Sequence, residues 1–400
     1  MQDREYIRQQ LKDGVVGTIF HTTTDSLFGR LSPTGYLPES LTGMYDGEYC
    51  RTIGAFVPLC LEMGRAKEAR KALEFIFLSM ERLGLEKIPH VLGLSADGNP
   101  YCISEEDQID GRAHVVLAFA QYCLTTGDTS FADRYYDLAC RETRTFFNQP
   151  YLYYQPLRQH WPSTGLRIVL NASFEHSREQ RRWSVFDLLT QVFVGAAGSA
   201  VKRLALQRDD LELARWLEER LEILRAGVQK YMTHMVGDER VYLEMRLPDG
   251  GWGKPYPGMS WVNLAPIAAG WDGMNEDIFL STMKILHQKL TICDPYGSGS
   301  RVTVIETDGN NAPQPVLMGK MVGWDIEFCR QQRDWKRIRD WMEFLNTHHT
   351  QSMVLMEAMR FTAEGWQLVD CGNGEQCCWW CWAMNRLNQA LCDQETPRLA

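Results

Sequence analysis

Six segments of the chain, taken together, are rich in carboxylates, aromatic side chains and glycine. They read GMYDGEYCR, SEEDQIDGRAH, NASFEHSREQRRW, GGWGKPYPGMSW, VIETDGNNAPQP and VDCGNGEQCCWW, and the chain contains 13 tryptophans in all. Aromatic rings stack on the apolar faces of sugars, and carboxylates and amides hydrogen-bond sugar hydroxyls. If the segments meet in one place, they predict a carbohydrate site. The competing interpretation is that Trp-rich loops only pack one end of the fold.

The first two segments carry charged groups suited to gripping a sugar. A carboxylate can accept hydrogen bonds from two hydroxyls, and a guanidinium donates in a fork. Helix capping together with a solvated run of charge is the alternative interpretation of the same residues. His114, one turn further on, is expected to be packed or hydrogen-bonded and not catalytic. The predicted contacts are Asp46, Glu48, Arg51, Asp107, Asp110 and Arg112.

The later segments extend this predicted binding surface. Trp252, Tyr256 and Trp261 could form a wall on which sugar rings stack, and Glu306 and Asp308 would complete a ring of acids. The remaining predicted contacts are Arg178, Trp183 and Trp380.

The elements that must position these residues are predicted to be helices, because apolar residues recur at helical spacing in most long segments. Short strand-like stretches such as RVTVIE and SMVLMEAM lie between them and need not form a large sheet. A weaker helix is expected at residues 2–13. The predicted helices span residues 48–63, 66–83, 110–126, 129–147, 183–206, 209–232, 260–270, 275–290, 316–331, 334–347 and 375–391.

The helices come in pairs with similar joints. At Gly127–Asp128, glycine is expected to cap one helix in the left-handed conformation and aspartate to begin the next. The first helix of each pair is apolar around most of its surface, and the second is amphipathic, as an inner and an outer ring would require. We therefore predict an all-α fold, an (α/α)6 toroid forming one domain over residues 1–400, with long loops at one end.

At the level of pattern, the chain resembles the six-hairpin glycosidases, a group that includes glucoamylase-like and mannosylglycerate-hydrolase-like enzymes. Three segments carry the resemblance: GMYDGEYCRTIGAF, NASFEHSREQRRWSVFDLLTQVFVGAAGSAVKRLA, and SMVLMEAMRFTAEGW with the following GNGEQCCWWCWAMNRL. Thr52 follows Arg51 where the family has Asp. The resemblance implies a glycoside hydrolase, usually inverting, that cleaves an oligosaccharide or small glycoside. Inversion requires two carboxyl groups separated widely enough to admit a water.

The resemblance also implies which carboxyl groups carry the chemistry. Glu175, just before a long inner helix, is the predicted acid, with Asp110 as its rival. Glu357, alone in the apolar stretch VLMEAM, is the predicted base, with Glu375 as its alternative. Helix capping for Glu175 and Glu375, and an ion pair with Arg360 for Glu357, are the structural interpretations. Glu179 is disfavoured because neighbouring arginines would lower its pKa.

Composition narrows the partners. The net charge of −9 argues against a nucleic-acid binder, and no apolar run could span a bilayer. The start, MQDREYIRQQLKDG, has no secretory pattern, so a cytoplasmic location is expected, a trimmed secretion signal being the alternative. Buried reduced thiols are expected for the 12 cysteines, because they are scattered through apolar stretches of a large chain with no visible signal. The cluster Cys371, Cys377, Cys378 and Cys381 lacks the paired C-x-x-C spacing of a structural zinc site, so core packing is expected there. We expect a carbohydrate as partner and no metal or cofactor. The oligomeric state is left open.

Three other functions compete with hydrolysis. A sugar epimerase of the N-acylglucosamine 2-epimerase type shares the predicted barrel but relies on histidines near its axis, whereas acids dominate the loops of this chain. A polysaccharide lyase would use a Tyr/His or Arg constellation. A non-catalytic helical-repeat binding protein would present helix faces instead of loaded loops.

Overall fold

The computed structural model describes residues 2–148, 168–176, 181–247, 254–255, 258–304, 306–307, 312–313 and 316–392. Side chains are described for all of these except residues 175–176, 181–184, 247, 254–255, 306–307 and 312–313.

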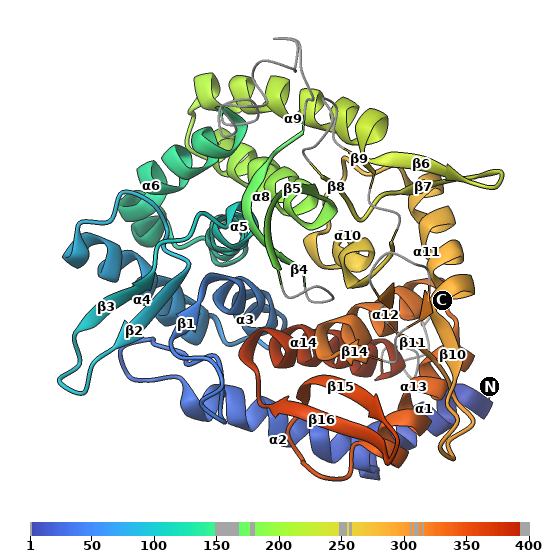
Figure 1. Ribbon diagram of the computed structural model, residues 1–400. Coiled ribbons are helices and arrows are strands. Elements are labelled where there is room, and N and C mark those ends of the chain that lie inside the picture. The colour runs from blue at the N-terminus through green and yellow to red at the C-terminus, as the bar shows by residue number, and fades with distance from the viewer. Residues whose placement is uncertain are drawn as a thin grey trace, which may run out of the picture.

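Paired helices form a closed double ring (Figure 1). Neighbouring inner elements pack on each other all the way round, and α14 packs back against α3 to close the circle. The predicted (α/α)6 toroid is therefore confirmed. In order around the ring, the inner elements are α3 (Cys50–Glu62), α5 (Ile109–Thr126), α8 (Leu188–Gln207), η1 and α10 (Trp261–Leu264 and Ala265–Ala269), α12 (Gly319–Gln332) and α14 (Gly374–Cys392).

Each inner element has an outer partner, and burial separates the two kinds as predicted. Every residue of α5 from position 109 to 120 is buried, whereas α4 (Ala66–Leu83) buries one face only. The helix α1 (Gln2–Asp13) packs beside the outer ring, against α2 (Val15–Arg30) and α13 (Trp335–His348). The outer helices are α2 (Val15–Arg30), α4 (Ala66–Leu83), α6 (Thr129–Asn148), α9 (Leu211–Tyr231), α11 (Glu276–Leu290) and α13 (Trp335–His348).

Close approach of the inner helices depends on glycine at two positions. A Cβ on Gly54 of α3 would lie 2.3 Å from Cβ of His114 on α5, and one on Gly323 of α12 would lie 2.8 Å from Cα of Trp380 on α14. Real Cβ atoms do not approach that closely, so these glycines let neighbouring backbones pack at short range.

The predicted joints have the expected chemistry. Gly127 ends α5 in the left-handed conformation with φ of 68°. The Asp128 carboxylate then accepts a hydrogen bond from the backbone N–H of Phe131 at 3.1 Å. Asp210 and Asp334 cap α9 and α13 in the same way, each accepting from a backbone N–H in the first turn. Local capping therefore fixes where these outer helices begin.

Short antiparallel sheets lie between the helices at one end of the ring. The stretch SMVLMEAM, expected to be strand-like, supplies the start of β15 (Met356–Thr362), which pairs with β14 (Val316–Met318) and β16 (Gly365–Cys371). The other sheets comprise β1 (Glu48–Tyr49), β2 (Val91–Leu94) and β3 (Pro100–Ser104); β4 (Asn171–His176), β5 (Arg181–Asp187), β8 (Met245–Leu247) and β9 (Lys254–Pro255); β6 (Thr233–Val236) and β7 (Glu239–Tyr242); β10 (Thr291–Cys293) and β11 (Arg301–Thr303); β12 (Glu306–Thr307) and β13 (Ala312–Pro313).

The observed helices differ from the predicted ones in two places. The helix predicted over 183–206 begins only at Leu188, because β5 occupies the preceding residues and Asp187 caps the helix. The helix α2 was not predicted, since VVGTIFHTTTDSLFGR is rich in β-branched residues and glycine, which weaken the local helical signal. Its packing against α14, α1 and α13 supplies the missing stabilisation. No helix among the described residues is long and apolar enough to cross a membrane.

Candidate functional site

The first turns of α3 and α5 are joined by an ion pair. Arg51 Nε donates to Asp110 Oδ2 at 2.5 Å, and Asn171 Nδ2 of β4 donates to Asp110 Oδ1 at 2.7 Å. Asp110 is fully buried, whereas the side chain of Arg51 is 14% exposed. Burial alone would raise the pKa of Asp110, but the charge and hydrogen bond of Arg51 outweigh it and lower that pKa. An ionised carboxylate with both oxygens engaged is suited to orienting Arg51, not to donating a proton.

A second ion pair joins α12 to α14. Lys320 Nζ lies 2.8 Å from Glu375 Oε1 and 3.9 Å from the centre of the Trp261 ring. Burial lowers the pKa of Lys320. Burial would raise the pKa of Glu375, but the charges of Lys320 and Arg51 outweigh it and hold that pKa below its usual value. Sequence reasoning missed Lys320, although a lone charge in the apolar stretch VLMGKMVGW was a usable signal.

Glu357 lies on β15, half-buried, beside this second pair. Tyr45 Oη, from the loop before α3, donates to Glu357 Oε1 at 2.8 Å. Burial raises the pKa of Glu357, and the hydrogen bond from Tyr45 partly opposes that shift. The charges of Lys320 and Glu375 also act on its pKa, so the three groups belong to one electrostatic cluster. Glu357 therefore ionises closer to neutral pH than an ordinary glutamate does.

Two further buried carboxyl groups adjoin these ion pairs, Asp187 beside Asp110 and Glu39 beside Glu375, and sequence reasoning missed both. Asp187 caps α8 and accepts from Thr190 N at 2.6 Å. Burial, followed by the charge of Asp110, raises the pKa of Asp187 to about 7. Burial likewise raises the pKa of Glu39 to about 7; Glu39 accepts from the Thr52 hydroxyl and from Glu375 N. A lone aspartate inside SVFDLLTQ was the available signal for Asp187.

Some of the side chains predicted to contact a sugar bind other protein groups in the structure. Arg112 lies 2.6 Å from Asp107 Oδ1 and 2.8 Å from Glu142 Oε2 of α6, so it ties the second loop to the outer ring. Glu48 is buried and accepts from the backbone N–H of Leu37 at 2.6 Å.

Two tryptophans and an aspartate of the predicted set have different surroundings. Trp380 is fully buried on α14, with its ring 6.3 Å from that of Phe20. Trp261 is also buried, below Lys320. Asp46 is exposed in the first loop.

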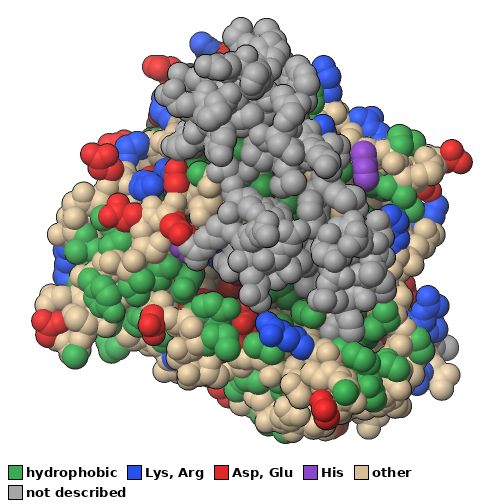
Figure 2. Space-filling view, viewed as in Figure 1, with side chains coloured by type: hydrophobic (Ala, Val, Ile, Leu, Met, Phe, Trp, Pro, Cys, Tyr) green, Lys and Arg blue, Asp and Glu red, His purple; other side chains and the backbone are tan. Residues whose placement is uncertain are grey.

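The remaining predicted residues lie outside what the structure describes. The backbones of Glu175, Trp183 and Glu306 lie in β4, β5 and β12, but their side chains are outside the described residues. The other four lie wholly outside them: Arg178, Trp252, Tyr256 and Asp308. In the space-filling view, acidic and basic side chains are both scattered over the described surface (Figure 2).

His114 is packed and hydrogen-bonded, as expected. Its ring stacks on Phe193 with centroids 3.4 Å apart, and Nδ1 lies 2.7 Å from the backbone oxygen of Asp110. Burial lowers the pKa of His114 to about 4, so its imidazole is neutral at ordinary pH.

The four clustered cysteines pack as thiols. Cys377, Cys378 and Cys381 are fully buried on α14, and Cys371 is half-buried on β16. Burial raises the pKa of Cys381 to about 12. Within the described part of the chain, no group of three His, Cys, Asp or Glu side chains is arranged to hold a metal ion.

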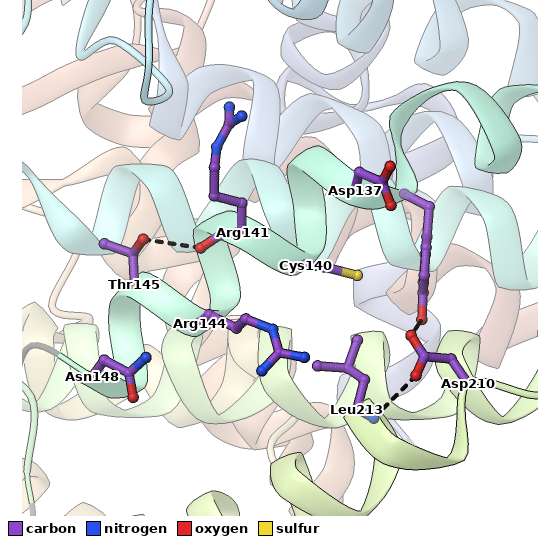
Figure 3. Close-up of a pocket in the computed structure, with 9 residues that line it drawn as sticks. Asp137, Cys140, Arg141, Arg144, Thr145, Asn148, Asp210 and Leu213 are labelled. Carbon is purple, nitrogen blue, oxygen red and sulfur yellow. Dashed lines mark hydrogen bonds between the residues drawn. The ribbon is translucent and has the colours of Figure 1, made fainter.

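A separate groove of about 600 Å³ lies on the outside of the ring, between α6 and α9. Figure 3 shows Arg144 of α6 reaching toward Leu213 of α9, and Tyr136 Oη donates to Asp210 at 2.9 Å. Asp110, Glu357 and Glu375 do not line this groove. We therefore place the candidate site at the loop end of the ring. The groove is lined by Tyr136, Asp137, Cys140, Arg141, Arg144, Thr145, Asn148, Asp210 and Leu213.

No protein-family model and no curated protein sequence matches the chain. Solved structures do match. A metal-independent α-mannosidase from Streptococcus pneumoniae, in complex with α-1,6-mannobiose, superposes with a TM-score of 0.69 over 96% of this chain and 97% of that chain, at 10% identity. A bacterial glucoamylase complexed with acarbose matches with a TM-score of 0.65 and 11% identity, over 94% of this chain and 56% of that chain.

A D-mannose isomerase matches with a TM-score of 0.60 and 13% identity, over 94% of this chain and 97% of that chain. At such identities the matches establish the fold alone. The chain therefore has the (α/α)6 fold of the six-hairpin glycosidases, which one sugar isomerase also shares, and the resemblance predicted from sequence is confirmed at that level.

Proposed function

We propose that the protein is a glycoside hydrolase that cleaves an oligosaccharide or small glycoside with inversion at the anomeric carbon. The observation that carries the proposal is Glu357, a half-buried carboxyl group with a raised pKa beside the ion pair of Lys320 and Glu375. Carboxyl groups in contrasting environments are what glycoside hydrolysis requires. The mannosidase and glucoamylase that share the fold act on or bind carbohydrates, which favours the same class of substrate here.

In this mechanism Glu357 is the general base that removes a proton from the attacking water. Tyr45 occupies one of its carboxylate oxygens. A raised pKa brings a base closer to the working pH, where it still ionises and accepts a proton efficiently. Glu375, the alternative base, accepts a hydrogen bond from Lys320 in an ion pair. This pairing favours an electrostatic role near the sugar over removal of a proton from water.

Glu175 and Asp187 are the candidates for the general acid. Both precede or begin α8, and burial raises the pKa of Asp187 to about 7, so a large share of this carboxyl group is protonated at neutral pH. An acid must be protonated to assist departure of the leaving oxygen. Arg51, oriented by Asp110, is the proposed donor to sugar hydroxyls.

The experiment is hydrolysis of a panel of oligosaccharides and aryl glycosides by the wild-type protein and by Glu357→Gln. We expect a loss of about 10²–10⁴-fold in kcat for the variant, the usual contribution of a general base. Proton NMR of the first product formed should show the anomer opposite to that of the substrate. Glu364→Gln, in the exposed turn of the same hairpin, is the matched control. Full activity of Glu357→Gln would remove Glu357 from the mechanism.

Sugar isomerisation is the second candidate function, because a D-mannose isomerase shares the fold. His114 lies on an inner helix with a neutral imidazole, the form that can accept a proton. Its ring is buried and stacked on Phe193, which favours a packing role. Incubation with free aldoses distinguishes the two functions, since an isomerase converts a free sugar and releases none.

A further inference from the structure

Asn171 joins three elements that meet at the candidate site. It lies on β4 and is fully buried. Its Oδ1 accepts a hydrogen bond from the backbone N–H of Ile109 at 3.1 Å, and its Nδ2 donates to Asp110 Oδ1 at 2.7 Å. One amide thus holds both the backbone and a side chain in the first turn of α5.

Asp110 passes this constraint on to α3. Its other oxygen, Oδ2, accepts from Arg51 Nε at 2.5 Å, and its backbone oxygen lies 2.7 Å from His114 Nδ1. With both oxygens engaged, the carboxylate plane is fixed, and so is the direction from which Arg51 approaches. Arg51 is the partly exposed member of the set, and its charge acts on Glu375.

We propose that Asn171 is a positioning residue that sets the orientation of Arg51 through Asp110, in a relay running from β4 through α5 to α3. The inference deepens the proposed function, because the role of Arg51 in holding the sugar belongs to it. The relay itself rests on the hydrogen bonds among described residues.

The chemistry of the position selects an amide. The N–H of Ile109 needs an acceptor, and the ionised Asp110 needs a donor; an asparagine side chain offers one of each. A carboxylate at position 171 would accept from Ile109 but would repel Asp110. A protonated carboxyl group would serve both partners, because its O–H can donate. The activity of Asn171→Asp should therefore depend on pH and approach that of the wild type where the new carboxyl group is protonated.

The test is kcat/KM across a pH series for Asn171→Asp and Asn171→Ala. We expect Asn171→Asp to be nearest to the wild type at acidic pH and to lose activity as the introduced carboxyl group ionises. Asn171→Ala should lose about 10²-fold at every pH, the scale of a roughly 1 Å misplacement of a binding group. Arg51, His114 and Asp187 are the titratable or charged groups that act on Asp110. Asn171→Ala keeps these three groups but has no new acid. Any pH dependence that comes from their titration will therefore appear in the alanine variant as well.

Asn263→Asp is the matched control. Asn263 is also fully buried at the start of an inner element; its Oδ1 accepts from Ser260 N at 2.9 Å and its Nδ2 donates to Tyr242 O at 3.1 Å. It donates to a carbonyl where Asn171 donates to a carboxylate, so Asn263→Asp introduces a comparable buried acid that is not bonded to the Arg51–Asp110 pair. Circular dichroism should show that all the variants fold.

A second readout does not depend on turnover. The Arg51 Nε–H signal in ¹⁵N NMR, assigned by its absence in Arg51→Lys, should disappear or shift in Asn171→Ala and should follow pH in Asn171→Asp. An unchanged Arg51 signal, or wild-type kcat/KM in folded Asn171→Ala, would overturn the relay. If no glycoside is hydrolysed, the proposed function fails. The NMR signal then still tests whether Asn171 orients Arg51 through Asp110.

Discussion

At the scale of single residues, the site depends on contrasts between chemically similar groups. Glu357 is half-buried and Glu375 is buried, and the pKa of the first is raised whereas that of the second is lowered. Burial raises both pKa values, but the ammonium group of Lys320 outweighs burial at Glu375, whereas the neutral hydroxyl of Tyr45 only partly opposes it at Glu357. Local charge therefore shifts the pKa values of two glutamates on neighbouring elements in opposite directions.

Tyr45→Phe tests this contrast. The hydroxyl stabilises the ionised form of Glu357, so its removal should raise the pKa of that carboxyl group further. If Glu357 acts as a base, the acidic limb of the pH–rate profile should move to higher pH. Kinetics across the acidic limb measure the shift.

Tyr122→Phe removes a comparable tyrosine–carboxylate hydrogen bond, to Asp128 at an outer joint, and should leave the profile in place. An unmoved acidic limb in folded Tyr45→Phe would show that Tyr45 does not act on the base.

At the scale of elements, one buried aspartate ties an inner helix to its neighbours. Asp325 of α12 is fully buried. It accepts hydrogen bonds from Trp341 Nε1 of α13 at 2.9 Å and from Thr303 Oγ1 of β11 at 3.0 Å, and His287 Nε2 of α11 lies 2.6 Å away. Burial opposes its ionisation, but Arg337 and His287 outweigh burial and lower the pKa of Asp325.

Asp325→Asn should destabilise the protein by about 3–5 kcal/mol at neutral pH, the usual cost of breaking a buried ion pair. Because the folded-state pKa is depressed, the contribution of Asp325 is fully present above its unfolded pKa of about 3.9 and is lost as pH falls through the folded pKa. The difference in the free energy of unfolding between the wild type and Asp325→Asn should therefore become smaller at acidic pH.

Urea denaturation at neutral pH and near pH 3 measures the gap. Asp277→Asn, on the exposed face of α11, is the control and should change stability little at either pH. An equal gap at both pH values would contradict an ionised Asp325.

At the scale of the whole molecule, the two ends of the chain complete the ring. The N-terminal helix α2 packs on the C-terminal inner helix α14, and Arg30 donates to the backbone oxygen of Gly372 at 2.5 Å. We propose that the ring behaves as one cooperative unit, because α14 packs on α3, α12 and α2 at once.

Ile19→Asp tests that proposal, since Ile19 is fully buried on α2. An uncompensated buried carboxylate should lower the free energy of unfolding by several kcal/mol. The midpoint temperature of a single unfolding transition, shared by the whole chain, should fall accordingly. Val15→Asp, on the exposed side of the same helix, should leave the transition almost unchanged. Calorimetry that resolved two transitions, with only one shifted by Ile19→Asp, would contradict a single unit.

The sequence by itself determined the helices and their division into two rings. Periodic apolar residues, the Gly127–Asp128 joint and the aspartates that begin α9 and α13 act within a few residues of one another, so local pattern was sufficient to predict them. Glu357 and Glu375 came from the resemblance to the six-hairpin glycosidases and not from periodicity, and their role as catalytic carboxyl groups stays a prediction. Local pattern failed for α2, whose stability comes from packing and not from propensity.

Only the tertiary structure decided which charges meet. Arg51 and Asp110 are 59 positions apart, Lys320 and Glu375 are 55 apart, and Tyr45 and Glu357 are 312 apart. Each pair forms only when the ring closes, and burial together with the partner then sets the pKa of each carboxyl group. Helical periodicity is a property of neighbours along the chain, whereas the protonation of a buried acid depends on what the closed fold places beside it.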